Sequence, residues 1–258
     1  MQNIELKKIE HGVKIGDVCG DIEPNVTEDS LFIDNGEVIG FYLKEIPQSL
    51  SKYIDIANAE FQSKRVPKST MNRTSGEQGL TERVQQFSTI LGGVPPRPHM
   101  KRPYPSISSV HQVSTAQTFI KAMLLAARES EKIIQQLAPE IYERQKRIIA
   151  EKVPPKFRFG ELFTSSISNF NIAASYHRDA GNLEGCVNVI IAKKHNARGG
   201  NTTVPDYGAT MDSRDNSMLV YPAWRNVHGV TPIRPTTEGG YRNSLVFYPL
   251  KAFNNHWD

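Results

Sequence analysis

The sequence predicts an α+β protein with a mainly β core, in which N-terminal helices precede and pack on a β-barrel. Two observations lead to this fold class. Apolar residues recur at helical spacing within residues 47–152, whereas after residue 156 the pattern changes to short strands separated by turn signals. Such a row of strands is typical of an antiparallel barrel or sandwich. We expect an extension over residues 1–155 and a barrel core over residues 156–258, forming one integrated domain.

The first predicted elements are a hairpin and a helix. Residues 30–43 are interpreted as two short strands around the turn signal Asp34-Asn35-Gly36. A helix is predicted from Pro47 to about Lys64, because apolar residues recur in it at helical spacing: Leu50, Ile54, Ala57 and Phe61.

Two further helices are predicted before the barrel. Ser114 can cap the first, which carries one apolar stripe made of Phe119, Met123, Ala127, Ile134 and Leu137. The second begins at Pro139, a favoured first helical position, and runs to about Lys152. Pro154 and Pro155 then end it, since proline cannot continue a helix.

The segment of residues 64–106 interrupts these patterns with frequent glycine and proline, and only a short helix around residues 80–90 is expected in it. Loops of this length in a compact domain are usually functional or mobile. Its cations, including Arg97, Lys101 and Arg102, are interleaved with aromatic residues, a composition that suits a phosphate backbone and an unstacked base. Taken alone, the segment is an ordinary solvated loop; beside a catalytic site we interpret it as a substrate lid.

Six strands are expected after residue 156. Turn signals separate them at short intervals, as in an antiparallel barrel. They cover residues 157–171, 186–194, 200–207, 217–222, 227–234 and 241–250.

Composition excludes several classes of protein. Of the 258 residues, 38% are hydrophobic and 22% are charged, which is enough apolar material for a sizeable core. No run of 18 apolar residues exists, so no membrane span is expected, and the N-terminus shows no apolar signal segment. The two cysteines, Cys19 and Cys186, fit neither a disulfide framework nor a CxxC zinc site and favour a reducing cytoplasm. The net charge of +4 is compatible with a nucleic-acid partner without establishing one.

Three residues form a candidate metal site. His177 and Asp179 are one residue apart, so in an extended chain both side chains leave the same face, and His228 lies on a different predicted strand. Two imidazoles and one carboxylate make the facial triad that holds Fe(II) and leaves positions open for a co-substrate and oxygen. An HxD tripeptide by itself often lies in a surface loop, so the assignment needs support from other residues of the chain.

Arg242 and Ser244 supply the second part of the pattern. They are two residues apart on one predicted strand and therefore share a face. A guanidinium can bind a carboxylate through two hydrogen bonds, and a serine hydroxyl can add a third. A buried arginine needs an anionic partner, which is either a core Asp or Glu or a ligand such as 2-oxoglutarate.

These motifs resemble the TET/JBP branch of the Fe(II)/2-oxoglutarate-dependent dioxygenases, which oxidise the 5-methyl group of pyrimidines in DNA. The resemblance covers roughly residues 156–256 and is carried by HRDxxN at 177–182, GG at 199–200, HGVTPI at 228–233 and RxSLVFY at 242–248, with a vaguer match at 36–42. It implies a double-stranded β-helix (jelly-roll, cupin-like) barrel. The chain has no large insert between Asp179 and His228, and in this it is more similar to the phage and bacterial members of the family. This likeness implies that the protein acts in the cytoplasm of a bacterium or of a phage host.

The resemblance also implies roles for single residues. His177, Asp179 and His228 match the iron ligands, whereas Arg242 and Ser244 match the groups that bind the distal carboxylate of 2-oxoglutarate. Two further residues match positions near the target base, each with an alternative. Asn182 matches a base-facing asparagine or is a turn residue, and Tyr248 matches an aromatic residue beside a flipped base or is a barrel-core residue.

The chain departs from the family pattern at Leu250, where some members have a base-contacting histidine. The choice between 5-methylcytosine and thymine therefore stays open here. Two other dioxygenase groups fit less well. An AlkB-like enzyme would have an arginine where this chain has Tyr248, and a prolyl-hydroxylase-like enzyme would have a lysine near the position of Glu238.

We therefore expect a dioxygenase that uses Fe(II), 2-oxoglutarate and O2 to hydroxylate the 5-methyl group of a pyrimidine in DNA, 5-methylcytosine ahead of thymine. One alternative is a 2-oxoglutarate dioxygenase acting on a free nucleotide, RNA or a protein side chain. Another is a non-catalytic DNA-binding module on the same fold. Oligomeric state and sequence context are not predicted.

Overall fold

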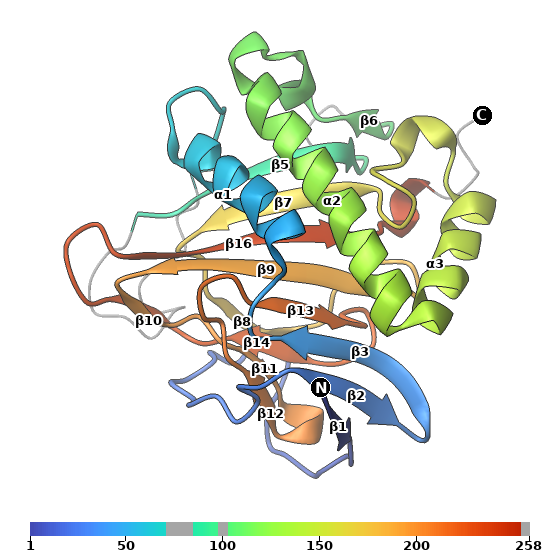
Figure 1. Cartoon of the computed structure of the whole chain (residues 1–258), viewed down its shortest axis with the longest axis vertical. Coiled ribbons are helices and arrows are strands. Elements are labelled where there is room, and N and C mark those ends of the chain that lie inside the picture. The colour runs from blue at the N-terminus through green and yellow to red at the C-terminus, as the bar shows by residue number, and fades with distance from the viewer. Residues whose placement is uncertain (71–84, 98–102, 254–258) are drawn as a thin grey trace.

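The computed structural model describes residues 1–70, 85–97 and 103–253, and within them three α-helices cover one face of a large β-sheet (Figure 1). A smaller sheet faces the opposite side of the large one. The fold is α+β and mainly β, as the sequence predicts. The helices are α1 (Gln48–Gln62), α2 (Gln117–Leu137) and α3 (Pro139–Lys152).

The large sheet has ten strands in the order β1-β2-β3-β13-β9-β16-β7-β5-β4, with β6 paired to β5. Strands from the first half of the chain extend it on both sides, since β3 pairs with β13 and β5 pairs with β7. Its strands are β1 (Gln2–Glu5), β2 (Ser30–Asp34), β3 (Glu37–Leu43), β4 (Ser69–Thr70), β5 (Phe87–Val94), β6 (Ser106–Ile107), β7 (Ser165–Phe170), β9 (Asn188–His195), β13 (Met218–Tyr221) and β16 (Tyr241–Tyr248).

The small sheet has four strands in the order β12-β11-β14-β8, and a separate pair joins β10 to β15. All of these pairings are antiparallel. The strands are β8 (Ala174–His177), β10 (Ala197–Gly199), β11 (Thr202–Val204), β12 (Ala209–Met211), β14 (His228–Val230) and β15 (Ile233–Pro235).

Strand β16 shows how the large sheet separates core from site. Leu245 and Phe247 are completely buried in the cluster that packs against the helices. Because side chains alternate along a strand, Arg242 and Ser244 point to the other face, towards the small sheet. The polar residues that are candidates for binding and catalysis therefore lie between the two sheets.

The helix layer is held by aromatic and aliphatic packing. Phe61 of α1 and Phe119 of α2 are fully buried, with ring centroids 6.1 Å apart, and Phe61 also meets Phe87 of β5 at 5.1 Å. The predicted apolar stripe of α1 is buried, and so is that of α2 except for Leu137, which is partly buried. These contacts attach α1 and α2 to the outer face of the sheet.

Several predicted elements are confirmed. The hairpin of β2 and β3 turns at Asn35 and Gly36, which have φ values of 52° and 79°, as Asn-Gly turns require. Helix α1 occupies the range predicted from Pro47, and α3 begins at Pro139. One detail was wrong: Ser114 does not cap α2, because Ser114–Ala116 form a 3-10 turn and Ala116, which makes no side-chain cap bond, is the residue before the helix.

The region around residues 80–90 was predicted as a short helix, and its described part is a strand instead. Residues from Phe87 onward form β5, which pairs with β7 from Phe87–Phe170 to Gly92–Ser165. Pairing with an edge of the sheet overrides weak local helix propensity. Residues 71–84 lie outside the described residues.

The predicted strands after residue 156 are shorter than expected. Phe157 ends a 3-10 helix, and residues 158–164 precede β7 as a loop, in which Gly160 takes a φ of 79° and Phe159 pairs with Phe163. The range 227–234 divides into β14 and β15, since Pro232 has no N–H to continue a ladder. Within the described residues, no helix is long and apolar enough to cross a lipid bilayer.

Candidate active site

The predicted metal triad comes together at one edge of the small sheet. Strand β8 pairs with β14 so that His177 lies opposite His228, and Asp179 lies two residues after the end of β8. Asp179 Oδ1 is 3.3 Å from His177 Nε2 and 3.8 Å from His228 Nε2. One ligand atom from each residue lies within 4.8 Å of the others. The spacing of HxD and the register of two short strands thus produce a compact cluster.

Hydrogen bonds to the backbone orient both imidazoles. His177 Nδ1 is 2.8 Å from the carbonyl oxygen of Ser175, and His228 Nδ1 is 3.0 Å from that of Asn226. Carbonyl oxygens only accept, so each Nδ1 carries the proton and each Nε2 presents a lone pair. Two lone pairs and a carboxylate oxygen therefore face one another, an arrangement that a cation stabilises. The donor set fits Fe(II).

The protonation states agree with this arrangement. Burial, together with the neighbouring His177, lowers the pKa of His228 to about 4, so His228 is neutral near pH 7. Burial alone would raise the pKa of Asp179, but the two histidines and Asn188 hold it below its ordinary value. Tyr221 meets the His228 ring edge-on, with centroids 5.3 Å apart and planes at 86°.

The second oxygen of Asp179 belongs to a chain of amide groups. Asn188 Nδ2 donates to Asp179 Oδ2 over 2.9 Å, and Asn182 Nδ2 donates to Asn188 Oδ1 over 2.8 Å. The backbone N–H of Asn182 donates to the carbonyl of Asp179 over 2.9 Å. Asn182 therefore does close a turn, and its side chain also connects to the triad.

Arg242 is almost completely buried, with 2% of its surface exposed. Its Nε donates to Ser213 Oγ over 2.7 Å, and its backbone N–H donates to Asn171 Oδ1 over 2.9 Å. Burial lowers the pKa of Arg242 to about 10. Among the residues that the structure describes, no carboxylate forms an ion pair with Arg242, so the predicted alternative of a core Asp or Glu partner is not found there. The site fits an anionic ligand.

One cavity of about 580 Å³ joins these groups. Ser244 faces it beside Arg242 and accepts a hydrogen bond from Asn169 Nδ2 over 3.3 Å. Strands of both sheets contribute to its wall. The predicted residues that line it are His177, Asp179, Asn182, His228, Arg242, Ser244 and Tyr248.

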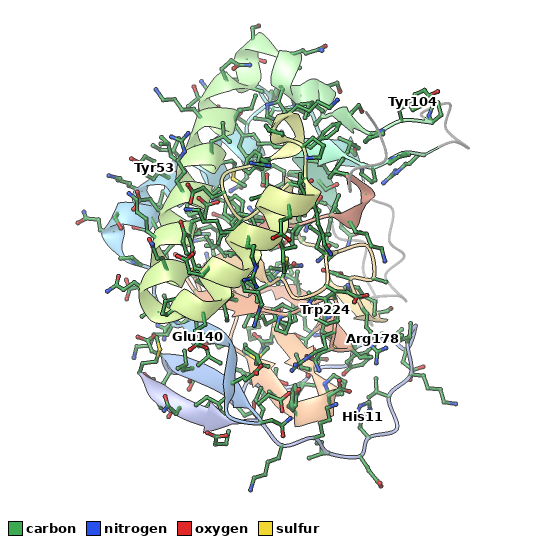
Figure 2. All side chains as sticks on the ribbon, turned by 90° about the vertical axis from the view of Figure 1, so that its right-hand side faces the viewer. His11, Tyr53, Tyr104, Glu140, Arg178 and Trp224 are labelled. Atoms are coloured by element: carbon green, nitrogen blue, oxygen red, sulfur yellow. The ribbon has the colours of Figure 1, made fainter. Side chains whose placement is uncertain are left out.

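The predicted substrate contacts divide into two groups. Tyr248 lines the cavity, and burial together with Asp179 raises its pKa. Arg97 lines a neighbouring cavity of about 460 Å³ with Lys68. Lys101 and Arg102 lie outside the described residues. In the described part of the predicted lid, Arg65 pairs with Glu60 and Tyr104 projects from the body with 67% of its surface exposed (Figure 2).

Four residues of the site were not predicted. Asn188 contacts Asp179 from the next strand, and Ser213 contacts Arg242, 29 residues away in the sequence. Tyr221 lines the cavity with a buried hydroxyl that has no partner among the described residues. Arg178 lies between two triad residues, is exposed (Figure 2) and also lines the cavity. Of these four residues, only Arg178 could have been found from the sequence, because it lies between two predicted iron ligands in the HRD motif.

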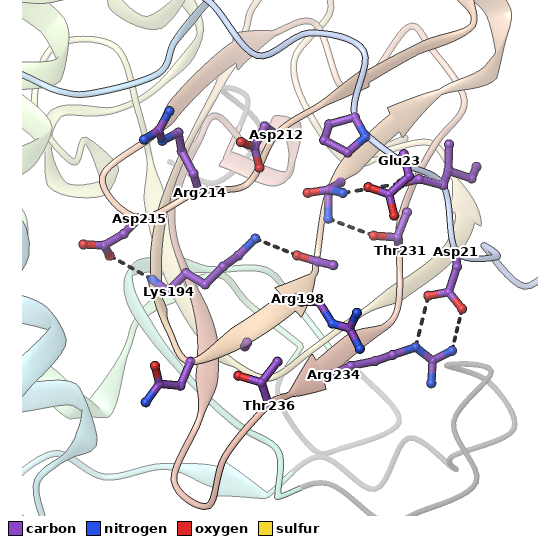
Figure 3. Close-up of a pocket in the computed structure, with 16 residues that line it drawn as sticks. Asp21, Glu23, Lys194, Arg198, Asp212, Arg214, Asp215, Thr231, Arg234 and Thr236 are labelled. Atoms are coloured by element: carbon purple, nitrogen blue, oxygen red, sulfur yellow. Dashed lines mark hydrogen bonds and ion pairs between the residues drawn. The ribbon is translucent and has the colours of Figure 1, made fainter.

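A second cavity, of about 720 Å³, is distinct from this site (Figure 3). Charges of both signs line it, and several are already satisfied within the chain. Arg234 binds Asp21 through two contacts of 3.1 and 2.5 Å, and Lys194 Nζ donates to the carbonyl of Gly199 over 2.8 Å. The cavity that contains the triad is therefore the candidate active site.

Comparison with known proteins shows the family of the chain. The family profile described as "Oxygenase domain of the 2OGFeDO superfamily" (Tet_JBP) matches residues 97–251. The chain belongs to this Tet/JBP oxygenase family. It is therefore an Fe(II)/2-oxoglutarate-dependent dioxygenase that uses O2, and the predicted family, enzyme class and cofactors are confirmed.

Comparison with solved structures shows the same fold in NgTET1. NgTET1 in complex with 5mC DNA superposes with a TM-score of 0.58 at 13% identity, covering 93% of this chain and 84% of that one. A 2OG-Fe(II) oxygenase family oxidoreductase from Burkholderia pseudomallei gives a TM-score of 0.48 at 14% identity, covering 83% and 86%. Comparison with curated proteins gives no match.

Proposed function

We propose that this dioxygenase hydroxylates the 5-methyl group of a pyrimidine in DNA, with 5-methylcytosine ahead of thymine. One observation carries the proposal: a single cavity contains the triad, the Arg242–Ser244 pair and the Asn182–Tyr248 pair. These three sets correspond to a metal, an anionic co-substrate and a planar polar substrate. The structural likeness to NgTET1, which was solved with 5mC DNA, supports the choice of substrate.

The triad would hold the iron. His177 and His228 would bind through Nε2, because backbone carbonyls occupy both Nδ1 groups, and Asp179 would bind through Oδ1, because Asn188 occupies Oδ2. When bound, Fe(II) supplies the oxidising chemistry in which O2 is split between succinate, formed with CO2 from 2-oxoglutarate, and the new hydroxyl group.

Arg242 and Ser244 would bind the distal carboxylate of 2-oxoglutarate. The guanidinium is buried, oriented by Ser213 and without an internal carboxylate among the described residues, so an incoming carboxylate would satisfy it. Ser244 lies two residues along the same face and can add its hydroxyl. The protein thus orients the co-substrate and excludes water from its charged end.

Tyr248 and Asn182 would hold the base. The methyl group of a stacked base cannot enter the cavity that contains the triad, so a duplex substrate must turn its nucleotide out of the helix. The Tyr248 ring offers a surface for stacking, which every base can use. Exposed Arg178 beside the cavity would contact a phosphate of the extruded nucleotide.

The proposal is tested by measuring whether DNA methylation stimulates succinate formation. Protein reconstituted with Fe(II) and 2-oxoglutarate without oxygen would receive oxygen together with matched DNAs that contain or lack 5-methylcytosine. We expect faster succinate release with methylated DNA and none from the Asp179→Ala variant. Equal, slow release with both DNAs, and no oxidised nucleoside in either, would move the search to nucleotides, RNA or proteins.

A further inference from the structure

We infer that Asn188 sets the direction of the Asn182 amide, so that the site accepts a hydrogen bond from the 4-amino group of cytosine and disfavours the 4-carbonyl group of thymine. Asn188 is a positioning residue in this scheme, since it acts through Asn182. The inference rests on the proposed function and specifies the base edge that this same cavity recognises.

The direction follows from the chemistry of the groups in the chain. Asp179, as a carboxylate, can only accept hydrogen bonds, so the group of Asn188 that meets Oδ2 at 2.9 Å must be its NH2. The oxygen of Asn188 then faces Asn182 at 2.8 Å and must receive the NH2 of that residue. The oxygen of Asn182 is left as the end of the chain. Turning either amide would bring two acceptors, or two donors, together.

The surroundings hold this chain in place. Asn188 and Asn182 are both buried, with 2% and 4% of their surface exposed. Asn188 pairs with Tyr221 across β9 and β13, and on its other side Val189 pairs with Phe247, which puts Asn188 next to Tyr248. Asn182 is fixed by its backbone bond to Asp179 and by a bridge to Leu250. Both amides therefore sit on paired backbone.

The oxygen of Asn182, which ends this chain of hydrogen bonds, meets the cavity near Tyr248. Among the described residues, none donates a hydrogen bond to Asn182 Oδ1, and Asn182 lines the cavity. Leu250, also on the wall, has no polar group to offer. A base stacked on Tyr248 would therefore present its 4-position to a hydrogen-bond acceptor. The amino group of cytosine is a donor, whereas the 4-carbonyl of thymine is a second acceptor.

The wild-type holoprotein provides the first test. We would measure its binding, with Fe(II) and 2-oxoglutarate and without oxygen, to single-stranded DNAs that differ at one base: 5-methylcytosine, thymine, or 5-methylcytosine with two methyl groups on its amino nitrogen. The third base lacks the donor. We expect 5-methylcytosine to bind about 10- to 100-fold more tightly than the other two, the effect of one unpaired buried polar group. Equal binding of 5-methylcytosine and thymine would overturn the inference.

The Asn188→Leu variant tests the role of Asn188 itself. Leucine has a similar size and cannot orient Asn182, so we expect the ratio of 5-methylcytosine to thymine binding to fall towards one. The control is Asn169→Leu, the same change in the same cavity beside Ser244, which should leave that ratio unchanged. A general loss of fold or of iron would weaken the binding of both DNAs by the same factor, so the binding ratio would not change. A wild-type ratio in Asn188→Leu would contradict the role of Asn188.

The two levels of the proposal fail differently. If the wild-type protein neither binds nor oxidises any of these DNAs, the proposed function is wrong. If it oxidises 5-methylcytosine and thymine in DNA at equal rates, the proposed function holds and the inference about Asn188 and Asn182 is wrong.

Discussion

The two triad histidines have different surroundings but the same orientation. The side chain of His228 is 5% exposed and that of His177 is 40% exposed, yet each donates Nδ1–H to a carbonyl two residues earlier in its own strand region. The backbone therefore sets the tautomer of both rings before a metal binds. Such preorganisation is what an outer set of hydrogen bonds contributes to a metal site.

Removal of Asp179 should destroy the iron site. Asp179→Ala leaves two neutral nitrogen ligands, so iron affinity should fall by more than the roughly 10- to 100-fold that loss of an outer hydrogen bond costs, and turnover should disappear. Iron content after anaerobic loading and succinate release measure both effects. Asp55→Ala, at an exposed carboxylate paired with Lys193, is the matched control. Wild-type iron content and turnover in Asp179→Ala would contradict the ligand assignment.

Replacement of Arg242 should act on the co-substrate. Arg242→Ala removes a charged hydrogen-bond donor from a buried site, so the KM for 2-oxoglutarate should rise about 10- to 100-fold while turnover at saturation changes less. Arg242→Lys keeps the charge but loses the two-pronged donor and should lie in between. Succinate release as a function of 2-oxoglutarate concentration gives the values. An unchanged KM in Arg242→Ala would exclude this role.

At the scale of elements, the turn between β10 and β11 supports the Arg242 side chain. Gly200 has a φ of 72°, and a Cβ there would lie 2.9 Å from Arg242 Cδ. Gly200→Ala should therefore displace the arginine and raise the KM for 2-oxoglutarate about tenfold, because overpacking of this kind costs about 1–3 kcal/mol. Gly239→Ala is the control, since Gly239 has a similar φ of 77° and no neighbour within 4 Å. An equal KM in both variants would contradict this account.

Helix α2 is joined to the loop before β7 through a buried carboxyl group. Glu131 Oε1 accepts hydrogen bonds from the backbone N–H groups of Glu161 and Leu162, at 2.7 and 3.0 Å. Burial raises the pKa of Glu131 to about 7 from 4.5. Because the folded pKa is the higher one, the folded state gains from protonation below about pH 4.5, and this gain is lost as pH rises through about 7.

This linkage predicts a pH-dependent contribution to stability of roughly 3 kcal/mol between pH 4.5 and 7. Glu131→Gln keeps the accepting oxygen and cannot ionise, so the variant should lose this dependence and be more stable than the wild type at pH 8. Thermal unfolding of both proteins from pH 5 to pH 8 measures it. Parallel pH profiles for the two proteins would show that Glu131 makes no such contribution.

The elements also show which parts of the site could be predicted from sequence. The pairs His177–Asp179 and Arg242–Ser244 could be predicted, because residues two apart in an extended chain share a face whatever the fold. Asn188 was not, because its link to Asp179 depends on the register of β9 between β13 and β16. Ser213 reaches Arg242 from a loop that is remote in the chain. Strand β5 was missed because only its partner β7 makes it a strand.

For the whole molecule, the two faces of the large sheet divide stability from chemistry. The helices cover one face (Figure 1) and pack their apolar stripes on it. The other face and the small sheet enclose the triad and Arg242. Most of the proposed ligands therefore stand on paired strands, which hold positions more accurately than free loops do. The base-side residues lie where β16 ends and the turn after Asp179 begins.

The most direct test of the account is the identity of the oxidised product. Fe(II)- and 2-oxoglutarate-loaded protein would be given oxygen with three DNAs: one with 5-methylcytosine, one with thymine as its only methylated base, and one with neither. Their nucleosides would be analysed by mass spectrometry while succinate is measured. We predict that 5-methylcytosine gains the mass of one oxygen atom, in equal amount to succinate. Succinate formation in the presence of 5-methylcytosine DNA with no oxidised nucleoside would contradict the central claim.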